Sequence, residues 1–273
     1  MSYDINENIE KQAYVPVEDW PTIQEMADGF TEHRIPGTSA LAGRTICLDF
    51  ENGDIVRYEF VDEKILSREV LRGAIAAGAG ACKTCEAYEA YEVRPGIFFV
   101  SIYNPDREEM VSLIWKSEDG NVFVAASSYV EVDGERRTKT DFTSAVIEGL
   151  PGGKPIAQTS DLAGKRVLYR YSSDDWYEHV YFNKETMAWH CVNGAEKGLA
   201  DVEKCAYFGL DEDLYILFWT ETVLPIESII IVDLKELRST GRFFCWDPKP
   251  QKTIAITFGS LATVLNQTTY PQI

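Results

Sequence analysis

The chain of 273 residues has few basic residues and no long apolar run. Its 26 lysines and arginines stand against 44 aspartates and glutamates, which gives a formal net charge of −18 at pH 7. A protein this acidic repels phosphate backbones and anionic lipid, so we expect neither nucleic acid nor a membrane as a partner. No apolar stretch approaches the length of a membrane-spanning helix, and the polar N-terminus is unlike a signal peptide.

The sequence also lacks the motifs of zinc ribbons and nucleotide-binding loops. Cys82 and Cys85 have the spacing of half a zinc ribbon, but no second C-x-x-C follows. We therefore interpret the six cysteines as free thiols in a reducing compartment, and we expect a cytoplasmic location. The small residues Gly78-Ala79-Gly80 have no phosphate-binding pattern after them, which favours a simple turn.

Histidine is scarce. The three histidines are His33, His179 and His190, the minimum for a catalytic zinc site with three histidine ligands. His33 precedes the first of the two repeats described below, and the other two lie in the second, so a shared metal requires an unfavourable geometry. We predict neither a metal nor a nucleotide cofactor.

What the chain does contain is an internal repeat. Residues 41–50, LAGRTICLDF, correspond to residues 162–171, LAGKRVLYRY, and residues 91–103 correspond to residues 207–219. The offset of about 120 residues is too long for a solenoid and matches the size of a whole domain. The repeat predicts two domains that arose by duplication.

Both copies consist of short strand-like segments separated by turn residues, a pattern typical of antiparallel sheets. About eight strands per copy can close into a small barrel that holds one ligand. We predict an all-β fold with two tandem lipocalin-like (calycin) antiparallel β-barrels and a short N-terminal helix from Asp19, its N-cap, to about Gly29. The expected segments are a lead-in at 1–40, a first barrel at 41–148, a Gly- and Pro-rich linker at 149–161 and a second barrel at 162–273.

The expected strands can be placed from these turns. Candidates in the first copy are residues 44–50, 55–61, 84–93, 97–104, 109–116 and 121–129; those in the second are 165–171, 177–183, 186–192, 202–209, 213–221, 227–235, 240–247 and 252–258.

One expected strand of the second copy combines a carboxylate with aromatic residues. The alternation of side chains along residues 214–221 places Tyr215, Leu217, Trp219 and Glu221 on one face. If that face points into the barrel, desolvation raises the pKa of Glu221 and suits it to proton transfer near neutral pH. The alternative is that Glu221 ends its strand in solvent.

Neighbouring strands supply further polar groups. Tyr169 and Tyr171 share a face of their strand. His179 and His190 lie on adjacent strands and could line one cavity, although a lone histidine often has only a structural role.

The first copy lacks these groups. It has Leu48 and Phe50 in place of the two tyrosines, and Tyr103-Asn104-Pro105 in place of Trp219-Thr220-Glu221. If the pocket is a working site, we expect the second copy to hold it and the first to be scaffold or a second wall.

The second copy resembles the C-terminal half of the MoaF family in three segments: Tyr177-Glu178-His179-Val180-Tyr181, Trp189-His190-Cys191 and Glu196-Lys197-Gly198-Leu199-Ala200-Asp201. The resemblance covers most of residues 35–260. It implies two calycin-like halves, and the family name implies an association with molybdenum-cofactor biosynthesis.

The same half is similar to bacterial phenolic acid decarboxylases, which are lipocalin-like barrels without a cofactor. Gly164 with Tyr169-Arg170-Tyr171 matches their G-x-x-x-x-Y-x-Y strand, and Trp219-Thr220-Glu221 matches their W-T-E. The resemblance implies that the tyrosines bind a carboxylate and that the glutamate handles the phenol or the proton, through a quinone methide. The arginine of their G-R-W is absent, and Lys197, the nearest counterpart, lacks the planar fork that grips a carboxylate.

Together these features predict a cofactor-free lyase or isomerase of specialised metabolism. It would act by elimination, decarboxylation or cyclisation on a small apolar phenolic or enolic substrate. The alternatives are a non-catalytic small-molecule carrier, or an accessory protein of molybdenum-cofactor metabolism. The expected partner is a small apolar or aromatic ligand, and the sequence also allows a homodimer. The expected catalytic residues are Glu221, Tyr169, Tyr171 and His190, and the expected substrate-binding residues are His179, Lys197, Trp189, Tyr215 and Trp219.

Overall fold

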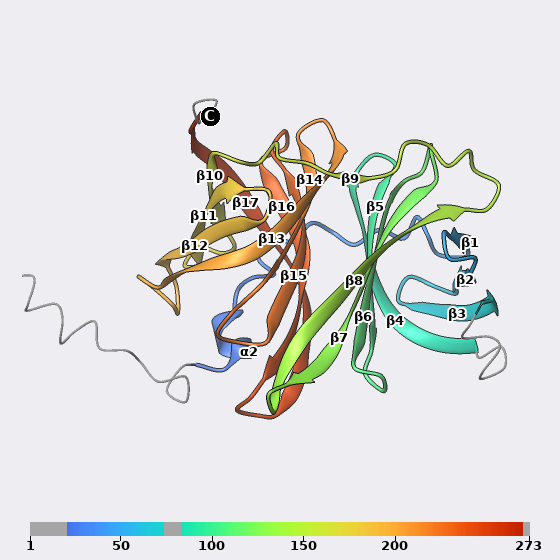
Figure 1. Cartoon of the computed structure of the whole chain (residues 1–273), viewed down its shortest axis with the longest axis horizontal. Coiled ribbons are helices and arrows are strands. Elements are labelled where there is room, and N and C mark those ends of the chain that lie inside the picture. Colours follow the sequence, from blue (N-terminus) through green and yellow to red (C-terminus); the bar gives the residue numbers. More distant parts are fainter. Residues whose placement is uncertain (1–20, 74–82, 270–273) are drawn as a thin grey trace, which may run out of the picture.

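The computed structural model describes residues 21–73 and 83–269. Nearly all of its regular structure is antiparallel strand, arranged as two closed β-barrels that stand side by side (Figure 1). The predicted fold class is confirmed. The residues Asp19, Gly78-Ala79-Gly80 and Cys82, which the sequence singled out, lie outside the described residues. Within those residues, no helix is long and apolar enough to cross a membrane.

The first barrel consists of strands β1 to β8 in sequence order, and it closes where β8 pairs with β1. Its strands are β1 Thr45–Phe50, β2 Ile55–Phe60, β3 Ile65–Arg72, β4 Lys83–Arg94, β5 Ile97–Asn104, β6 Glu109–Lys116, β7 Asn121–Val132 and β8 Glu135–Ile147.

The second barrel closes in the same way, through β10 with β17 and β12 with β13. The short β9 lies in the Gly- and Pro-rich segment between the barrels and adds to the edge of β13. The strands are β9 Ala157–Gln158, β10 Lys165–Arg170, β11 Trp176–Asn183, β12 Thr186–Asn193, β13 Ala200–Asp211, β14 Leu214–Thr220, β15 Ile226–Asp233, β16 Arg238–Asp247 and β17 Lys252–Gln267. The exact domain boundaries stay a prediction.

Strand β14 shows why these residues form this architecture. Tyr215, Leu217 and Trp219 point into the second barrel, where they belong to its hydrophobic core. The alternate residues Leu214 and Ile216 point outward and pack in a separate apolar cluster with residues of the first barrel. The strand is therefore apolar on both faces, as expected for a strand that is covered on both sides.

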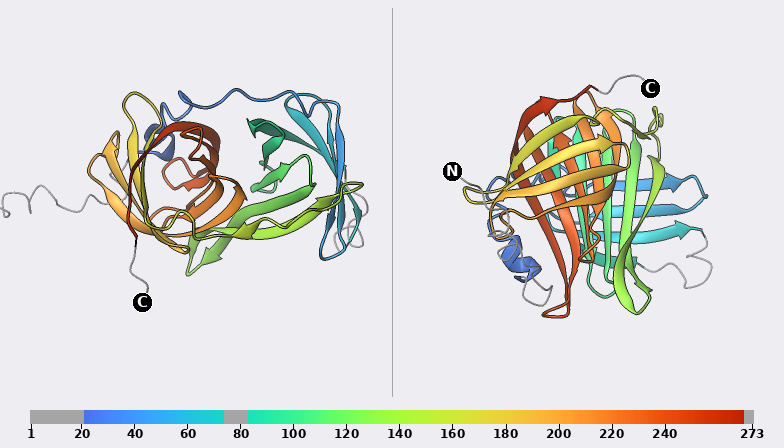
Figure 2. Two further views of the ribbon diagram at one scale, coloured as in Figure 1. Left: turned by 90° about the horizontal axis from the view of Figure 1, so that it is seen from above. Right: turned by 60° about the vertical axis from the view of Figure 1, so that its left-hand side comes forward.

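The two barrels pack face to face over this apolar cluster, and the left view of Figure 2 shows them next to each other. Tyr91, Phe99 and Phe123 contribute from the first barrel. Polar links border the cluster: Arg94 donates to the two carboxylate oxygens of Asp233 at 3.0 and 2.6 Å. An interface this apolar fixes the relative placement of the barrels.

The N-terminal helix α2, Ile23–Met26, is shorter than predicted, and its N-cap is Thr22. The side chain of Thr22 accepts a hydrogen bond from the backbone of Glu25, whose carboxylate in turn accepts from the backbone of Thr22. The helix lies against the second barrel, although the chain continues into the first (Figure 1). Its backbone is held there because the amide of Ile23 donates to Asp247 at 2.9 Å.

Candidate active site

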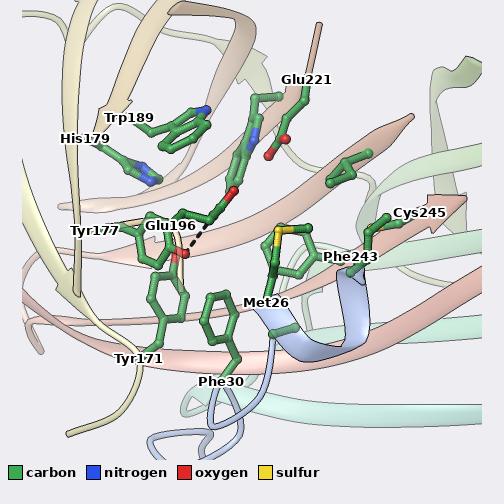
Figure 3. Close-up of a pocket in the computed structure, with 14 residues that line it drawn as sticks. Met26, Phe30, Tyr171, Tyr177, His179, Trp189, Glu196, Glu221, Phe243 and Cys245 are labelled. Atoms are coloured by element: carbon green, nitrogen blue, oxygen red, sulfur yellow. Dashed lines mark hydrogen bonds between the residues drawn. The ribbon is translucent and has the colours of Figure 1, made fainter. Parts of the chain in front are cut away.

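A pocket lies at one end of the second barrel, under α2 (Figure 3). Its walls come from strands β11, β12, β14, β15 and β16. Tyr171, directly after β10, and Glu196, in the loop between β12 and β13, complete them. Its volume is about 60 Å³, enough for a few water molecules. The lining residues are Ile23, Met26, Ala27, Phe30, Tyr171, Tyr177, His179, Trp189, Glu196, Trp219, Glu221, Ile226, Phe243 and Cys245.

Glu221 lines this pocket, as the strand alternation predicts. It follows β14 directly, and its backbone amide donates to the carbonyl of Ile226 at 3.0 Å, which fixes its position. Burial raises the pKa of Glu221 well above its ordinary value, and the nearby carboxylates of Glu196 and Glu203 raise it further. The interaction with the indole of Trp219 acts in the opposite direction. The carboxyl group is therefore held in its protonated form at higher pH than an exposed glutamate.

A second carboxyl group in the pocket, that of Glu196, was not among the predicted site residues. It comes from the β12–β13 loop and accepts a hydrogen bond from the hydroxyl of Tyr177 at 2.8 Å (Figure 3). Burial raises the pKa of Glu196, and the bond from Tyr177 lowers it. Glu196 lies in the segment that resembles the MoaF family, which was the one signal for it in the sequence.

Aromatic rings form most of the remaining wall. Phe30 stacks on Tyr171 with ring centroids 4.4 Å apart, and Trp219 meets Phe243 edge to face. The indole nitrogen of Trp219 is buried beside the pocket, where it interacts with the carboxyl group of Glu221. A buried donor at a pocket wall is a group that a ligand can also engage.

The two predicted tyrosines occupy different depths of the barrel. Tyr171 lines the pocket, whereas Tyr169, on the same face, lies deeper in the core. The hydroxyl of Tyr169 is 2.8 Å from that of Tyr181, so its hydrogen bond is already made inside the protein. Tyr215 is also buried in the core away from the pocket. Alternation along a strand predicted the face correctly, but it carries no information on depth.

His179 and His190 do not share the cavity, which corrects the expectation from the sequence. The register of β11 with β12 pairs His179 with Trp189 and Glu178 with His190. His179 and Trp189 both line the pocket, while His190 is exposed on the outer face, 3.7 Å from the carboxylate of Glu178. A shift of one residue along a strand moves a side chain to the opposite face, and the sequence did not fix this register.

Lys197, the predicted cation, is exposed on the β12–β13 loop and does not line the pocket. Its neighbour Glu196 points inward instead. No lysine or arginine is among the described residues that line the pocket. Among the described residues there is also no group of three or more histidine, cysteine, aspartate or glutamate side chains placed to hold a metal ion.

The strand pairing also corrects the expected match between the two copies. Extending the β13–β14 ladder by one residue places Glu203 opposite Glu221, and extending the β4–β5 ladder places Glu86 opposite Asn104, whose side chain donates to Glu86. Glu203 pairs with Met187 as Glu86 pairs with Leu66, so the two glutamates occupy equivalent positions. Asn104, opposite Glu86, therefore takes the place of Glu221. The sequence alignment was off by one residue here, although the turns before β5 and β14 have the same length.

His179 is expected to make the protein sensitive to acid. Burial lowers its pKa to about 3, against about 6.5 in an unfolded chain. Below pH 6.5 the histidine therefore binds a proton in the unfolded chain but not in the folded protein. The free energy of unfolding falls by about 1.4 kcal/mol per pH unit as the pH drops towards 3. Above pH 6.5 the effect vanishes.

Denaturant unfolding between pH 7.5 and 4.5 checks this expectation. His179→Gln should show a flatter acid limb than the unmutated protein. The matched control is His190→Gln, on the exposed face of the adjacent strand, which should keep the full slope. Equal slopes for His179→Gln and the unmutated protein would show that His179 is protonated in the folded state.

Comparison with known proteins locates the chain in a family. The model of the MoaF N-terminal domain matches residues 18–131, and that of the MoaF C-terminal domain matches residues 156–268. The chain belongs to the MoaF family. It is 28% identical to Protein MoaF of Klebsiella aerogenes over 267 residues, which cover 90% of this chain and 95% of that protein. In terms of MoaF domains, the pocket walls come from the C-terminal domain and the covering residues of α2 from the N-terminal one.

Among solved structures, a chain from Burkholderia vietnamiensis described provisionally as a beta-lactamase is similar to part of this MoaF-family protein. The two share 15% sequence identity at a TM-score of 0.33, over 40% of this chain and 100% of that chain. A likeness of this size carries no information about function.

Proposed function

We propose that this MoaF-family protein is an enzyme that transfers protons to and from a small, largely apolar, uncharged substrate with a phenol or enol group. The reaction would be an isomerisation, an elimination or a cyclisation, without a metal or nucleotide cofactor. The observation that carries the proposal is the pair of carboxyl groups, Glu196 and Glu221, in a pocket otherwise lined mainly by apolar and aromatic side chains. Two carboxyl groups in different surroundings are a recurrent arrangement for acid and base roles.

The raised pKa of Glu221 suits this group to both halves of a proton transfer. Glu221, with its raised pKa, would donate its proton to a carbon or oxygen of the substrate as general acid. The resulting Glu221 carboxylate would then take a proton from another position of the same substrate, so that the enzyme returns to its starting state. Trp219 and Tyr171 offer donors to an oxygen that gains negative charge, and the apolar wall strengthens these contacts by excluding water.

The pocket favours an uncharged substrate over a carboxylate. Two carboxyl groups line it and no cation of the described residues does, so a substrate carboxylate would be buried without a partner of opposite charge. The resemblance to phenolic acid decarboxylases implied a cationic partner for that group, and Lys197 lies outside the pocket. Isomerisation or elimination is therefore better supported than decarboxylation.

Access to the pocket depends on the residues that cover it. With Met26 and Phe30 seated over the barrel, about 60 Å³ is too little for a phenol-sized molecule, so the covering segment has to move or repack when a substrate enters. Phe30→Ala should increase the share of tryptophan fluorescence that acrylamide quenches, because Trp189 and Trp219 become accessible. Phe182→Ala, which removes an exposed ring of β11, is the matched control. Unchanged quenching in Phe30→Ala would show that substrates enter elsewhere.

Incubation with a panel of phenols, enols and enolisable ketones in D₂O, followed by mass spectrometry, tests the proposed function. We expect deuterium to enter a carbon position of at least one compound, with or without a change of isomer, and we expect this to depend on Glu221. Proton exchange is visible even when the net reaction is reversible, so the test does not require the natural product. Saturable binding without exchange, mass change or isomer change would favour a carrier and overturn the proposal.

A further inference from the structure

The first barrel, which we expected to be scaffold or a second wall, contains an open cavity. Its volume is about 530 Å³, within the range of ordinary small-molecule sites. Its wall comes from strands β1, β2, β3, β4, β6, β7 and β8. The other end of the barrel is closed by its hydrophobic core, in which Phe60, Phe98 and Trp115 pack.

The cavity occupies the same place in the first barrel as the candidate active site does in the second. Tyr58 and Arg68 face each other across β2 and β3, as His179 and Trp189 do across β11 and β12. Phe50 takes the place of Tyr171. The amide of Phe50 donates to the carbonyl of Asp54 across the turn after β1, and the amide of Tyr171 donates to that of Asp175 across the turn after β10.

Smaller side chains explain why this cavity is open. The strand pairings show that Ala126 takes the place of Phe243. Ala126 lies opposite Val111 in the first barrel, and Phe243 lies opposite Ser228 in the second. In the same way Val56 replaces Tyr177. Two rings that fill the second pocket are therefore missing from the first, and among the described lining residues none comes from the helix α2.

A polar cluster lies on one wall, at positions where a purely structural barrel interior would be apolar. Arg68 donates to Glu109 at 2.9 Å and lies 3.1 Å from Glu86. Glu86 also accepts a hydrogen bond from Asn104 at 2.8 Å. Tyr58 is buried beside Arg68, and this burial raises the pKa of its hydroxyl to about 12, which keeps it a neutral donor.

The charges around the cavity select against charged ligands. Arg68 and Arg107 balance Asp54 and Glu109 among the lining residues. Arg68 is already paired with Glu86 and Glu109, so its guanidinium offers little to a ligand anion, and a ligand cation would bring a further buried charge next to Arg68. The opposite wall is apolar, with Val111, Val124 and Ala126. A hydroxyl or carbonyl group against the polar wall, with an apolar body against the other, fits these surroundings.

We propose that the first barrel is a second small-molecule site, which binds an uncharged, largely apolar compound through a hydroxyl or carbonyl group held by Arg68 and Tyr58. This site is separate from the candidate active site, and its test does not depend on catalysis. The duplication has in this case produced two cavities of different chemistry, where the sequence had suggested one site and one scaffold.

Calorimetric titration with three probes that share one ring system tests the proposal: 2-naphthol, 2-naphthoate and 2-naphthylmethylammonium at neutral pH. We expect the neutral 2-naphthol to bind most tightly. Ala126→Phe introduces the ring that fills the second pocket and should weaken this binding at least about tenfold. Tyr58→Phe removes one hydroxyl and should weaken it about fivefold, as expected for one lost hydrogen bond.

Thermal unfolding of each variant shows whether the barrel is intact, and Val56→Tyr fills the same space if Ala126→Phe does not fold. The proposal is overturned if 2-naphthol binds the variant with the filled cavity, Ala126→Phe or Val56→Tyr, as tightly as it binds the unmutated protein. It is overturned as well by tighter binding of either charged probe, or by the absence of binding of all three.

Discussion

Replacing Glu221 with glutamine is expected to lower the rate of proton exchange by about 10²–10⁴-fold, the usual effect of losing a general acid or base. Glutamine has nearly the same shape, and Glu221 makes its positioning hydrogen bond through the backbone, so the fold and ligand binding should change little. The control is Glu185→Gln, an exposed carboxylate in the turn between β11 and β12, which should keep the full rate.

The pH dependence of the same rate distinguishes a catalytic from a structural role. Since the pKa of Glu221 is raised, its acid form persists above the usual carboxyl range, and the rate should fall as the pH rises through that shifted value. This inflection should be absent from the residual activity of Glu221→Gln. Full activity in Glu221→Gln, or an unchanged inflection, would move the chemistry away from this residue. Glu196→Gln then becomes the variant to compare.

Replacing Arg242 with methionine is expected to destabilise the protein by about 3–5 kcal/mol, because it leaves a buried carboxylate without its partner. Arg242 on β16 is fully buried, and its guanidinium contacts Glu227. The same group donates to Ser112 at 3.0 Å and to Ser127 at 2.9 Å, both in the first barrel. This one side chain therefore links the two barrels across their interface.

Denaturant unfolding measures the effect. The double variant Arg242→Met with Glu227→Met should recover much of the loss, since no buried charge remains unpaired. The matched control is Arg57→Met, which breaks the partly exposed pair with Glu69 within the first barrel and should cost less than about 1 kcal/mol. A loss in Arg242→Met as small as that in Arg57→Met would show that water reaches the interface.

The fold could be predicted because its signals are local. Turn residues and side-chain alternation located most strands, and the repeat gave the duplication. Two strands of the first barrel, β3 and β8, were not predicted. In β8 only the end near Ala145 and Ile147 is buried in the barrel, and its charged first half, which includes Arg136 and Arg137, runs alongside the second barrel. Alternation is a weak signal where a strand changes its surroundings partway along.

The candidate site could be predicted only in part. Trp219 and Glu221 follow from alternation along one strand, but the expected pairing of His179 with His190 was wrong, because Trp189 lies opposite His179. Glu196 lies on a loop, and Phe30 reaches the pocket from a segment more than a hundred positions earlier in the chain. Neither position has a periodic signal, because loop conformation and long-range packing depend on the assembled fold.

Difference infrared spectroscopy of the carboxyl groups tests most directly whether the second barrel holds a proton-transfer site. The unmutated protein at neutral pH should show the carbonyl stretch of a protonated, buried carboxylic acid, and Glu221→Gln should lose that band while Glu185→Gln keeps it. The band should disappear only when the pH is raised well above the usual carboxyl range. A protein without this band at neutral pH, or one that keeps it in Glu221→Gln, would contradict the assignment of Glu221 as the proton donor.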